Sequence, residues 1–184
     1  MKETAMNDYG TVIAPGTVRI ERSLPGPIER VWDYLTDSSK RGTWLAAGDM
    51  DLRVGGKVEL VFRNSELTTD DDPPPAKYAQ YAGESRMGGR ITACEAPNLL
   101  AYTWGEGGGD ESEVRFELTP QADRVHLVVT HSRLPDRDTL LSVAGGWHTH
   151  LGILEARLDG REPPGFWRTH TRVESEYAQR IPAV

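Results

Sequence analysis

A single apolar stripe late in the chain constrains the fold more than any other feature. Between residues 140 and 158, large apolar side chains recur at spacings of four, four, three and four, which predicts one face of a helix about five turns long. The stripe comprises Val143, Trp147, Leu151, Leu154 and Leu158. Gly160, followed by two prolines, ends it. Because Gly145 and Gly146 each disfavour a helix by about 1 kcal/mol relative to Ala, they either permit close packing or mark a later start of the helix.

A long one-sided helix needs a broad apolar surface to cover it, and the preceding sequence supplies alternating segments. Period-two alternation predicts strands at residues 17–24, 50–62, 88–95, 98–104, 112–120 and 124–132. In the second of these, Gly55–Gly56 divides the alternation into a hairpin, with Met50, Leu52 and Val54 before the turn and Val58, Leu60 and Phe62 after it. No helical period separates the last four segments. The pattern therefore predicts an antiparallel meander and an α+β fold.

Three shorter helices are predicted besides the long one. Pro27 suits a first helical position, and it is followed by an apolar face made of Ile28, Val31, Trp32 and Leu35. Asp37 can cap a second, short helix over residues 38–45. The last helix, over residues 166–181, carries Phe166, Val173, Tyr177 and Ile181 on one side. Residues 1–16 show no sustained period, so we expect a flexible tail there.

Two stretches interrupt this pattern. Residues 64–85 are acidic and contain three consecutive prolines, which cannot continue a strand ladder. We interpret them as a mobile loop, removable without unfolding, or alternatively as a lid that uses Tyr78 and Tyr81 as contacts. Residues 105–111 are rich in glycine but lack phosphate-loop spacing, which favours a flexible hairpin turn.

Composition narrows the function classes. A length of 184 residues suits one domain with a full core, and the net charge of −7 repels phosphate backbones and anionic lipids. We therefore expect no nucleic-acid or membrane-surface partner. Cys94 is the only cysteine, which excludes an internal disulfide and fits a reducing compartment. Neither a secretory signal nor an apolar run of about 20 residues is present, so we expect a cytoplasmic protein.

The candidate chemistry is sparse. The motifs HExxH, GxSxG and GxGxxG and any paired cysteines are missing. His148 and His150 would lie about 160° apart around a helix, a poor arrangement for sharing a metal ion, and we expect no metal and no cofactor. His131 ends the inward-facing row Val125, Leu127 and Val129. It is interpreted either as a core histidine held by hydrogen bonds or as a polar group that orients a ligand or moves a proton.

The order of these segments resembles the START-like (SRPBCC, Bet v 1-like) helix-grip superfamily. More narrowly, it resembles the homologues of the C-terminal domain of the heat-shock-protein ATPase activator. The resemblance rests on LPGPIERVWDYLTDSSKRGTWL, MDLRVGGKVELVF, GGRITACEAPNLLAYTW, VTHSRLP and GGWHTHLGILEARLDG, with FWRTHTRVESEYAQRI as an extension common in bacterial members. It implies a curved antiparallel sheet wrapped around a long C-terminal helix, with two short helices after the first strand.

This resemblance implies a division of the chain and a cavity. We expect a tail over residues 1–16, a helix-grip domain over 17–160 with the acidic insertion 64–85, and a helical extension over 161–184. In the superfamily an apolar cavity lies between the sheet and the long helix. The acidic insertion is longer than the family pattern implies at that hairpin.

The leading functional prediction is a protein that holds a small apolar or aromatic molecule in that cavity without covalent chemistry, since inward aromatic positions are many and ionisable ones few. The candidate ligand-binding residues are Trp44, Leu60, Phe62, Tyr102, Trp104, Phe116, His131, Trp147, His150 and Leu151. One alternative is a cyclase or dehydratase with His131 as acid or base beside Tyr102. Another is a co-chaperone-like or regulatory interaction protein. A homodimer and a chaperone partner are left open.

Overall fold

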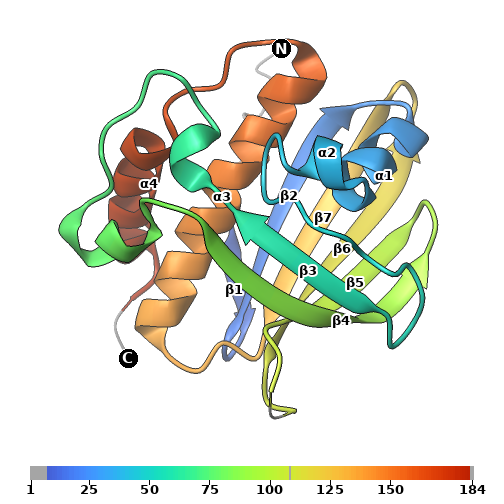
Figure 1. Ribbon diagram of the computed structural model, residues 1–184, viewed down its shortest axis with the longest axis horizontal. Helices are drawn as coiled ribbons and strands as arrows, with labels where there is room; N and C mark the ends of the chain where they lie inside the picture. Colours follow the sequence, from blue (N-terminus) through green and yellow to red (C-terminus); the bar gives the residue numbers. More distant parts are fainter. Residues whose placement is uncertain (1–7, 108, 183–184) are drawn as a thin grey trace.

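The computed structural model describes residues 8–107 and 109–182, and its centre is a seven-stranded antiparallel sheet that curves around one long helix (Figure 1). The strands are β1 (Thr11–Ala14), β2 (Thr17–Pro25), β3 (Lys57–Phe62), β4 (Ser85–Glu95), β5 (Leu99–Trp104), β6 (Ser112–Gln121) and β7 (Arg124–Ser132). Their order in the sheet is β1-β2-β7-β6-β5-β4-β3. This arrangement confirms the predicted α+β helix-grip fold.

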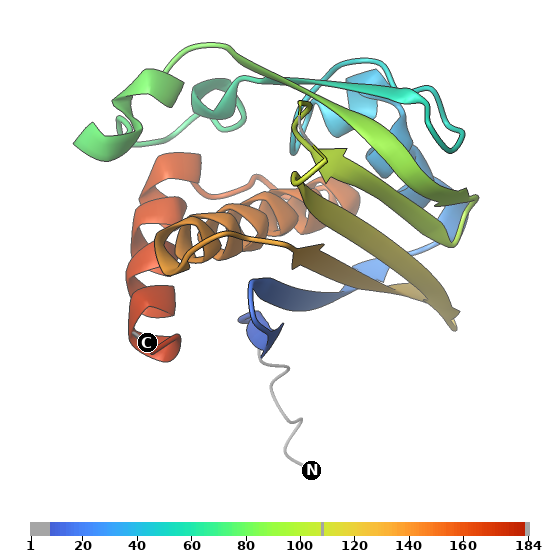
Figure 2. The ribbon, with the colours of Figure 1, turned by 90° about the horizontal axis from the view of Figure 1, so that it is seen from below.

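The helices follow the predicted order. They are α1 (Ile28–Thr36), α2 (Ser38–Arg41), α3 (Arg137–Asp159) and α4 (Phe166–Arg180), with 3₁₀ turns η1 (Asn64–Glu66) and η2 (Ala76–Tyr81). Helix α3 lies in the grip of the sheet, and α4 packs against α3 (Figure 2). Helix α2 ends at Arg41, with Gly42 as its C-cap, and is shorter than the expected residues 38–45. The chain then turns inward, and Trp44 is fully buried.

Helix α3 begins before its glycines rather than after them. The Asp136 carboxylate accepts a hydrogen bond from the Thr139 backbone N–H at 2.8 Å and caps the N-terminus. The helix ends at Gly160, whose φ of 70° is the left-handed conformation that glycine adopts without strain. A Cβ added to Gly145 would contact Glu174 of α4 at 3.4 Å, so this glycine sits at a close helix–helix approach. The close-packing interpretation of Gly145 is therefore the one the structure bears out.

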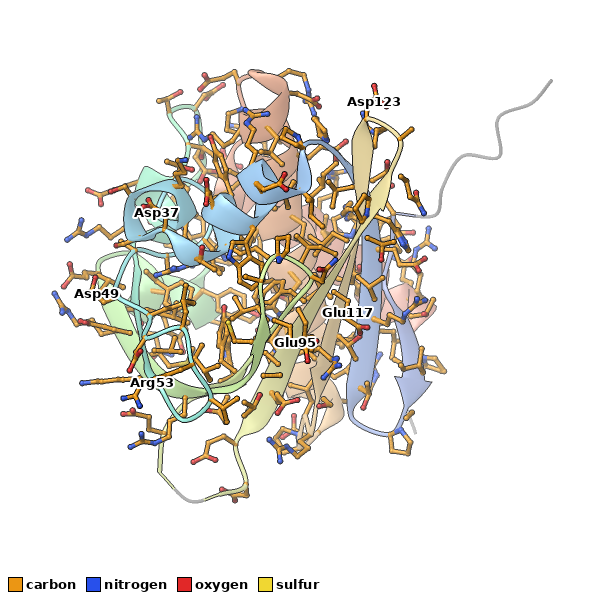
Figure 3. The ribbon with its side chains drawn as sticks, turned by 90° about the vertical axis from the view of Figure 1, so that its right-hand side faces the viewer. Asp37, Asp49, Arg53, Glu95, Glu117 and Asp123 are labelled. Carbon is orange, nitrogen blue, oxygen red and sulfur yellow. The ribbon has the colours of Figure 1, made fainter. Side chains whose placement is uncertain are left out.

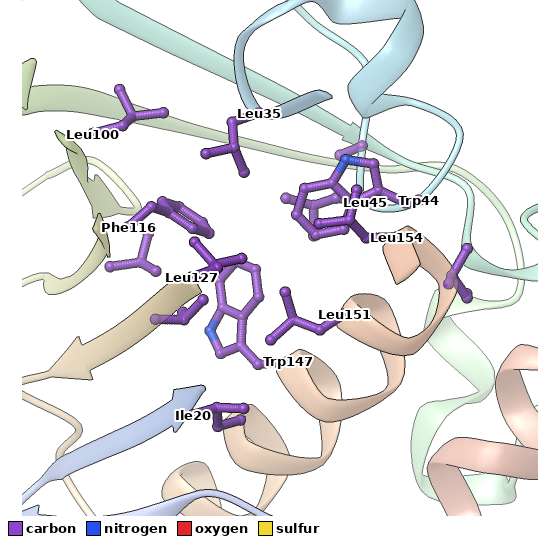
Figure 4. Packing of buried hydrophobic residues seen from close by; sticks show 14 of the residues in the cluster. Ile20, Leu35, Trp44, Leu45, Leu100, Phe116, Leu127, Trp147, Leu151 and Leu154 are labelled. Atoms are coloured by element: carbon purple, nitrogen blue, oxygen red, sulfur yellow. The ribbon is translucent and has the colours of Figure 1, made fainter. Parts of the chain in front are cut away.

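Alternation along the strands separates core from surface as predicted. In β6, Phe116 and Leu118 are buried, while Glu117 between them points outward (Figure 3). In β7 the predicted inward row of Val125, Leu127, Val129 and His131 is buried. Figure 4 shows the centre of this core, where the Trp147 side chain extends from α3 toward Phe116 and Leu127. The space between sheet and helix is filled by side chains at this point.

Two local predictions were wrong. The first arm of the expected hairpin is no regular strand: it forms only isolated bridges, Met50 to Val58 and Ala47 to Val61. Leu52 and Val54 are 43% and 70% exposed, so the alternating residues of this arm do not form a buried face. The reason lies in the turn, where a Cβ on Gly56 would approach the Asp51 carbonyl oxygen to 1.9 Å, and the chain folds too tightly to continue a ladder.

The expected tail also contains structure, because residues 11–14 form β1 against β2. Residues 1–7 of that expected tail lie outside the described part of the chain.

The acidic insertion, residues 64–85, is packed structure rather than a loose loop. The Asp71 carboxylate accepts hydrogen bonds from the backbone N–H groups of Trp167 at 2.9 Å and Arg168 at 3.1 Å, at the start of α4. The hydroxyl oxygen of Thr68 accepts from the Phe166 N–H at 3.1 Å. Gly165, the N-cap of α4, offers no side-chain hydrogen bond. The insertion therefore supplies the cap that α4 lacks in its own sequence.

Candidate functional site

A pocket of about 420 Å³ opens where the insertion, α3, α4 and the β3–β4 edge of the sheet meet. Its walls are Leu45, Phe62, Asn64, Tyr78, Tyr81, Ser85, Arg86, Met87, Trp104, Ser142, Val143, Gly146, Trp147, His150, Phe166, Trp167 and His170. Pockets that hold small molecules have volumes of about 300–1,000 Å³ and are lined mostly by apolar and aromatic side chains with a few polar groups. Both the size and the lining of this pocket fall in that class.

The ten candidate residues from the sequence divide into two groups. Phe62, Trp104, Trp147 and His150 line the pocket. The other six are buried in the core, with exposures of 0–1%, and do not line it: Trp44, Leu60, Tyr102, Phe116, His131 and Leu151. All six face inward, as predicted from strand alternation or, for Trp44 and Leu151, from helical segments. They fill the middle of the grip, however, whereas the pocket lies toward the insertion.

His131 is a core histidine with both ring nitrogens in hydrogen bonds. The indole Nε1–H of Trp147, which can only donate, gives a hydrogen bond to His131 Nδ1 at 2.9 Å. The proton therefore sits on Nε2, which lies 2.8 Å from Ser112 Oγ and donates to it. Burial lowers the pKa of His131 to about 3, so the ring is neutral near pH 7. Its position in the structure matches the first of the two interpretations, a histidine held by core hydrogen bonds.

His150 is the histidine that reaches the pocket. Its Nδ1 lies 2.8 Å from the carbonyl oxygen of Trp44, and because a carbonyl only accepts, Nδ1 carries the proton. The ring is packed between the rings of Phe166, with centroids 4.9 Å apart, and Phe62, at 6.5 Å. Burial lowers the pKa of His150 to about 4, so it too is neutral near pH 7. The pocket thus holds an uncharged imidazole of fixed tautomer.

The outer wall of the pocket is a polar cluster that joins the insertion to α4. The Tyr78 hydroxyl donates to Glu174 Oε2 at 2.6 Å and lies 3.1 Å from Ser142 Oγ of α3. Lys77 forms an ion pair with the same carboxylate, and His170 Nδ1 lies 3.5 Å from Glu174 Oε2. Burial raises the pKa of Glu174, but the hydrogen bonds from Lys77 and Tyr78 outweigh it and leave the pKa below its ordinary value. The carboxylate is therefore ionised and holds the wall together.

Sequence reasoning missed the contribution of α4. The apolar face predicted for that helix includes Phe166, and it includes neither Trp167 nor His170. The spacing of four between Phe166 and His170 puts both rings on one side of the helix, and this was an available signal. No signal indicated that α4 faces Tyr78, because the two segments are about 96 residues apart along the chain.

Few buried polar side-chain atoms of the described chain are left without a partner. Three buried side-chain atoms in residues 8–107 and 109–182 make no hydrogen bond: Asn64 Oδ1, Arg137 Nε and His170 Nδ1. Two of the three belong to residues that line the pocket. In the same ranges, no three His, Cys, Asp or Glu side chains gather as a metal site would require. None of the described helices is both long and apolar enough to span a bilayer.

Comparison with known proteins places this chain in a family. Residues 25–159 match the family described as "Activator of Hsp90 ATPase homolog 1-like protein". The chain belongs to this family. That assignment confirms the resemblance that the order of sequence segments suggested. The matched range ends at the last residue of α3, so α4 lies beyond it.

Solved structures share the fold over nearly the whole chain. The protein encoded by gene BPP1335 of Bordetella parapertussis is 44% identical, with a TM-score of 0.79 and coverage of 96% of this chain and 92% of that one. CalU16 of Micromonospora echinospora is 22% identical, with a TM-score of 0.66 and coverage of 95% and 96%. EF2215 of Enterococcus faecalis is 21% identical, with a TM-score of 0.66 and coverage of 96% and 91%. The last two likenesses concern the fold alone. A search of curated proteins gave no match.

Proposed function

We propose that this protein binds a small, planar aromatic molecule, without covalent chemistry, in the 420 Å³ pocket. The observation that supports the proposal is that the aromatic side chains lining the pocket come from four separate segments of the chain. Trp104 comes from β5, Trp147 from α3, Trp167 from α4 and Tyr78 from the insertion, and all four line one open space. Protein interiors are close-packed and leave few voids larger than a water molecule. A space of this size, bounded by rings from four segments, is suited to a flat apolar guest.

The rings hold one another in place before any ligand arrives. Trp104 lies 5.2 Å from Trp147 and 5.8 Å from Phe62, centroid to centroid. Tyr78 stacks on Trp167 at 6.0 Å. Aromatic pairs at these separations are mutually favourable, and a preformed site loses less side-chain entropy on binding. Rigid ring walls therefore favour a ligand that is itself rigid and flat.

The catalytic alternative depended on His131, which lies outside the pocket and already has two hydrogen-bond partners. The co-chaperone alternative rests on the family description and on no feature of this site. Ligand binding is the function that the pocket itself favours.

Gly146 provides a direct test because it lines the pocket and has open space where its Cβ would be. Gly146→Phe places a ring inside the pocket without a backbone clash. Gly152→Phe is the matched control, since Gly152 is on the same helix with equal space at its Cβ but does not line this pocket. The probe is 2-methoxynaphthalene, titrated by quenching of tryptophan fluorescence and by calorimetry.

We expect Gly146→Phe to weaken binding by about tenfold or more, equivalent to about 1.4 kcal/mol, and Gly152→Phe to bind like the unmodified protein. The proposal fails if the unmodified protein binds neither this probe nor 2-naphthol, or if filling the pocket leaves affinity unchanged.

A further inference from the structure

We propose that His150 makes the pocket selective for phenols, that is, for aromatic ligands whose ring hydroxyl donates a hydrogen bond to His150 Nε2. The inference deepens the proposed function and rests on binding in the same pocket. It concerns which aromatic molecules are preferred, and it starts from the orientation of a single imidazole ring.

The backbone around Trp44 fixes that orientation. Trp44 is fully buried, and its indole Nε1–H donates to the carbonyl oxygen of Tyr34 at 2.7 Å, so its own carbonyl has a defined position. His150 Nδ1–H donates to that carbonyl at 2.8 Å. A flip of the ring would break this bond and leave a buried carbonyl without its donor. The lone pair of His150 therefore stays on Nε2, on the opposite edge of the ring.

His150 Nε2 is an acceptor with no donor. It makes no hydrogen bond within the described residues, and it is not among the polar atoms that are sealed from the surface. The residue is 6% exposed and lines the 420 Å³ pocket, so this small accessible area belongs to the pocket. The rings of Phe62 and Phe166 flank the imidazole. An acceptor in such an apolar setting gains more from a donor than it would in water.

The charge state of the ring decides which donor fits. Because burial keeps the pKa of His150 at about 4, the ring near pH 7 offers a lone pair rather than a positive charge. A carboxylate or phosphate would place its own lone pairs against that of Nε2, whereas a hydroxyl can donate a hydrogen bond to Nε2. His150 Nε2 therefore favours a ligand that donates a hydrogen bond.

Two probes that differ only in the ability to donate test this inference. They are 2-naphthol and 2-methoxynaphthalene, which share the ring system, and the methyl ether has no hydroxyl proton. Dissociation constants of both are measured for the unmodified protein, for His150→Phe and for His148→Phe. The last is the matched control, because His148 is on the same helix but does not line this pocket.

The ratio of the two dissociation constants is the readout. We expect the unmodified protein and His148→Phe to prefer 2-naphthol by about three- to tenfold, as one neutral hydrogen bond gives, and His150→Phe to lose that preference. Equal affinities in the unmodified protein, or an unchanged ratio in folded His150→Phe, overturn the inference while ligand binding stands. If neither probe binds the unmodified protein, the proposed function fails and this inference with it.

A second measurement needs no substitution at His150. In protein labelled with ¹⁵N-histidine, accepting a hydrogen bond shifts the resonance of an unprotonated ring nitrogen upfield. We expect His150 Nε2 to shift on addition of 2-naphthol and to stay unmoved with the ether. Binding of 2-naphthol without that shift contradicts the inference even if the variant does not fold.

Discussion

Asp71 should stabilise the fold far more than an exposed acidic residue in an insertion would. Its carboxylate accepts from two backbone N–H groups at the start of α4, at 2.9 and 3.1 Å. Loss of a helix N-cap costs about 0.5–2 kcal/mol, and loss of a negative charge at a helix N-terminus costs about 0.3–1 kcal/mol more. Asp71→Ala should therefore lower the free energy of unfolding by about 1–3 kcal/mol.

Urea unfolding followed by circular dichroism measures this change, and a thermal melt should show a drop of about 2–4 °C per kcal/mol for a chain of this size. Asp72→Ala is the control, because among the described residues the Asp72 side chain pairs only with the exposed side chain of Arg168, at 3.3 Å. Exposed pairs of this kind contribute about 0–1 kcal/mol. If Asp71→Ala were no less stable than Asp72→Ala, the insertion would not be holding α4, and the packed arrangement would be refuted.

Two further predictions concern His131. His131→Phe leaves the buried Trp147 indole N–H without an acceptor, so it should lower the free energy of unfolding in urea by about 1–3 kcal/mol. His126→Phe, on the outer face of the same strand, is the control and should change this free energy little. Equal losses in the two variants would contradict the assignment of His131 as a core residue held by hydrogen bonds. Because the pKa of His131 lies at about 3 when folded and near 6.5 when unfolded, the unfolded state binds the extra proton, and stability should fall as the pH drops from about 6.5 toward 3. The slope is about 1.4 kcal/mol per pH unit, so the curve of His131→Phe should be flatter than that of His126→Phe by this amount, and parallel curves would show that His131 is not buried and neutral.

The fold was predictable because buried faces of helices and strands produce periodic patterns of apolar residues in the sequence. The stripe from Trp147 to Leu158 and the alternation in β6 and β7 indicate which side of each element faces the core, and the structure buries those sides, while Val143 at the start of the stripe is only partly buried. The same pattern misled at Leu52 and Val54, which alternate just before a tight turn but are exposed. Alternation also cannot separate an inward side chain that fills the core, such as Phe116, from one that borders open space, such as Phe62.

The site was less predictable because its walls meet through contacts that leave no local pattern. Tyr78 and Glu174, which join the insertion to α4, are 96 residues apart, and Asp71 reaches Trp167 over the same separation. The sequence leaves two interpretations of His131 open, because its partners, Trp147 and Ser112, lie 16 and 19 residues away along the chain. Each of these pairs is specified by the assembled fold rather than by neighbours along the chain.

The two segments that build the outer half of the pocket also depend on each other. The insertion gives α4 its cap through Asp71, and α4 in return holds η2 through Glu174, which binds both Lys77 and Tyr78. The segment matched to the family ends at residue 159, so α4 lies beyond it. Buried side chains such as those of Trp44 and Leu151 fill the space between the sheet and α3, so this space has little influence on which ligand is bound. We therefore expect ligand preference in this chain to be set by His150 on the inner wall and by the insertion and α4 on the outer wall. Substitutions in either outer segment should alter affinity through the other.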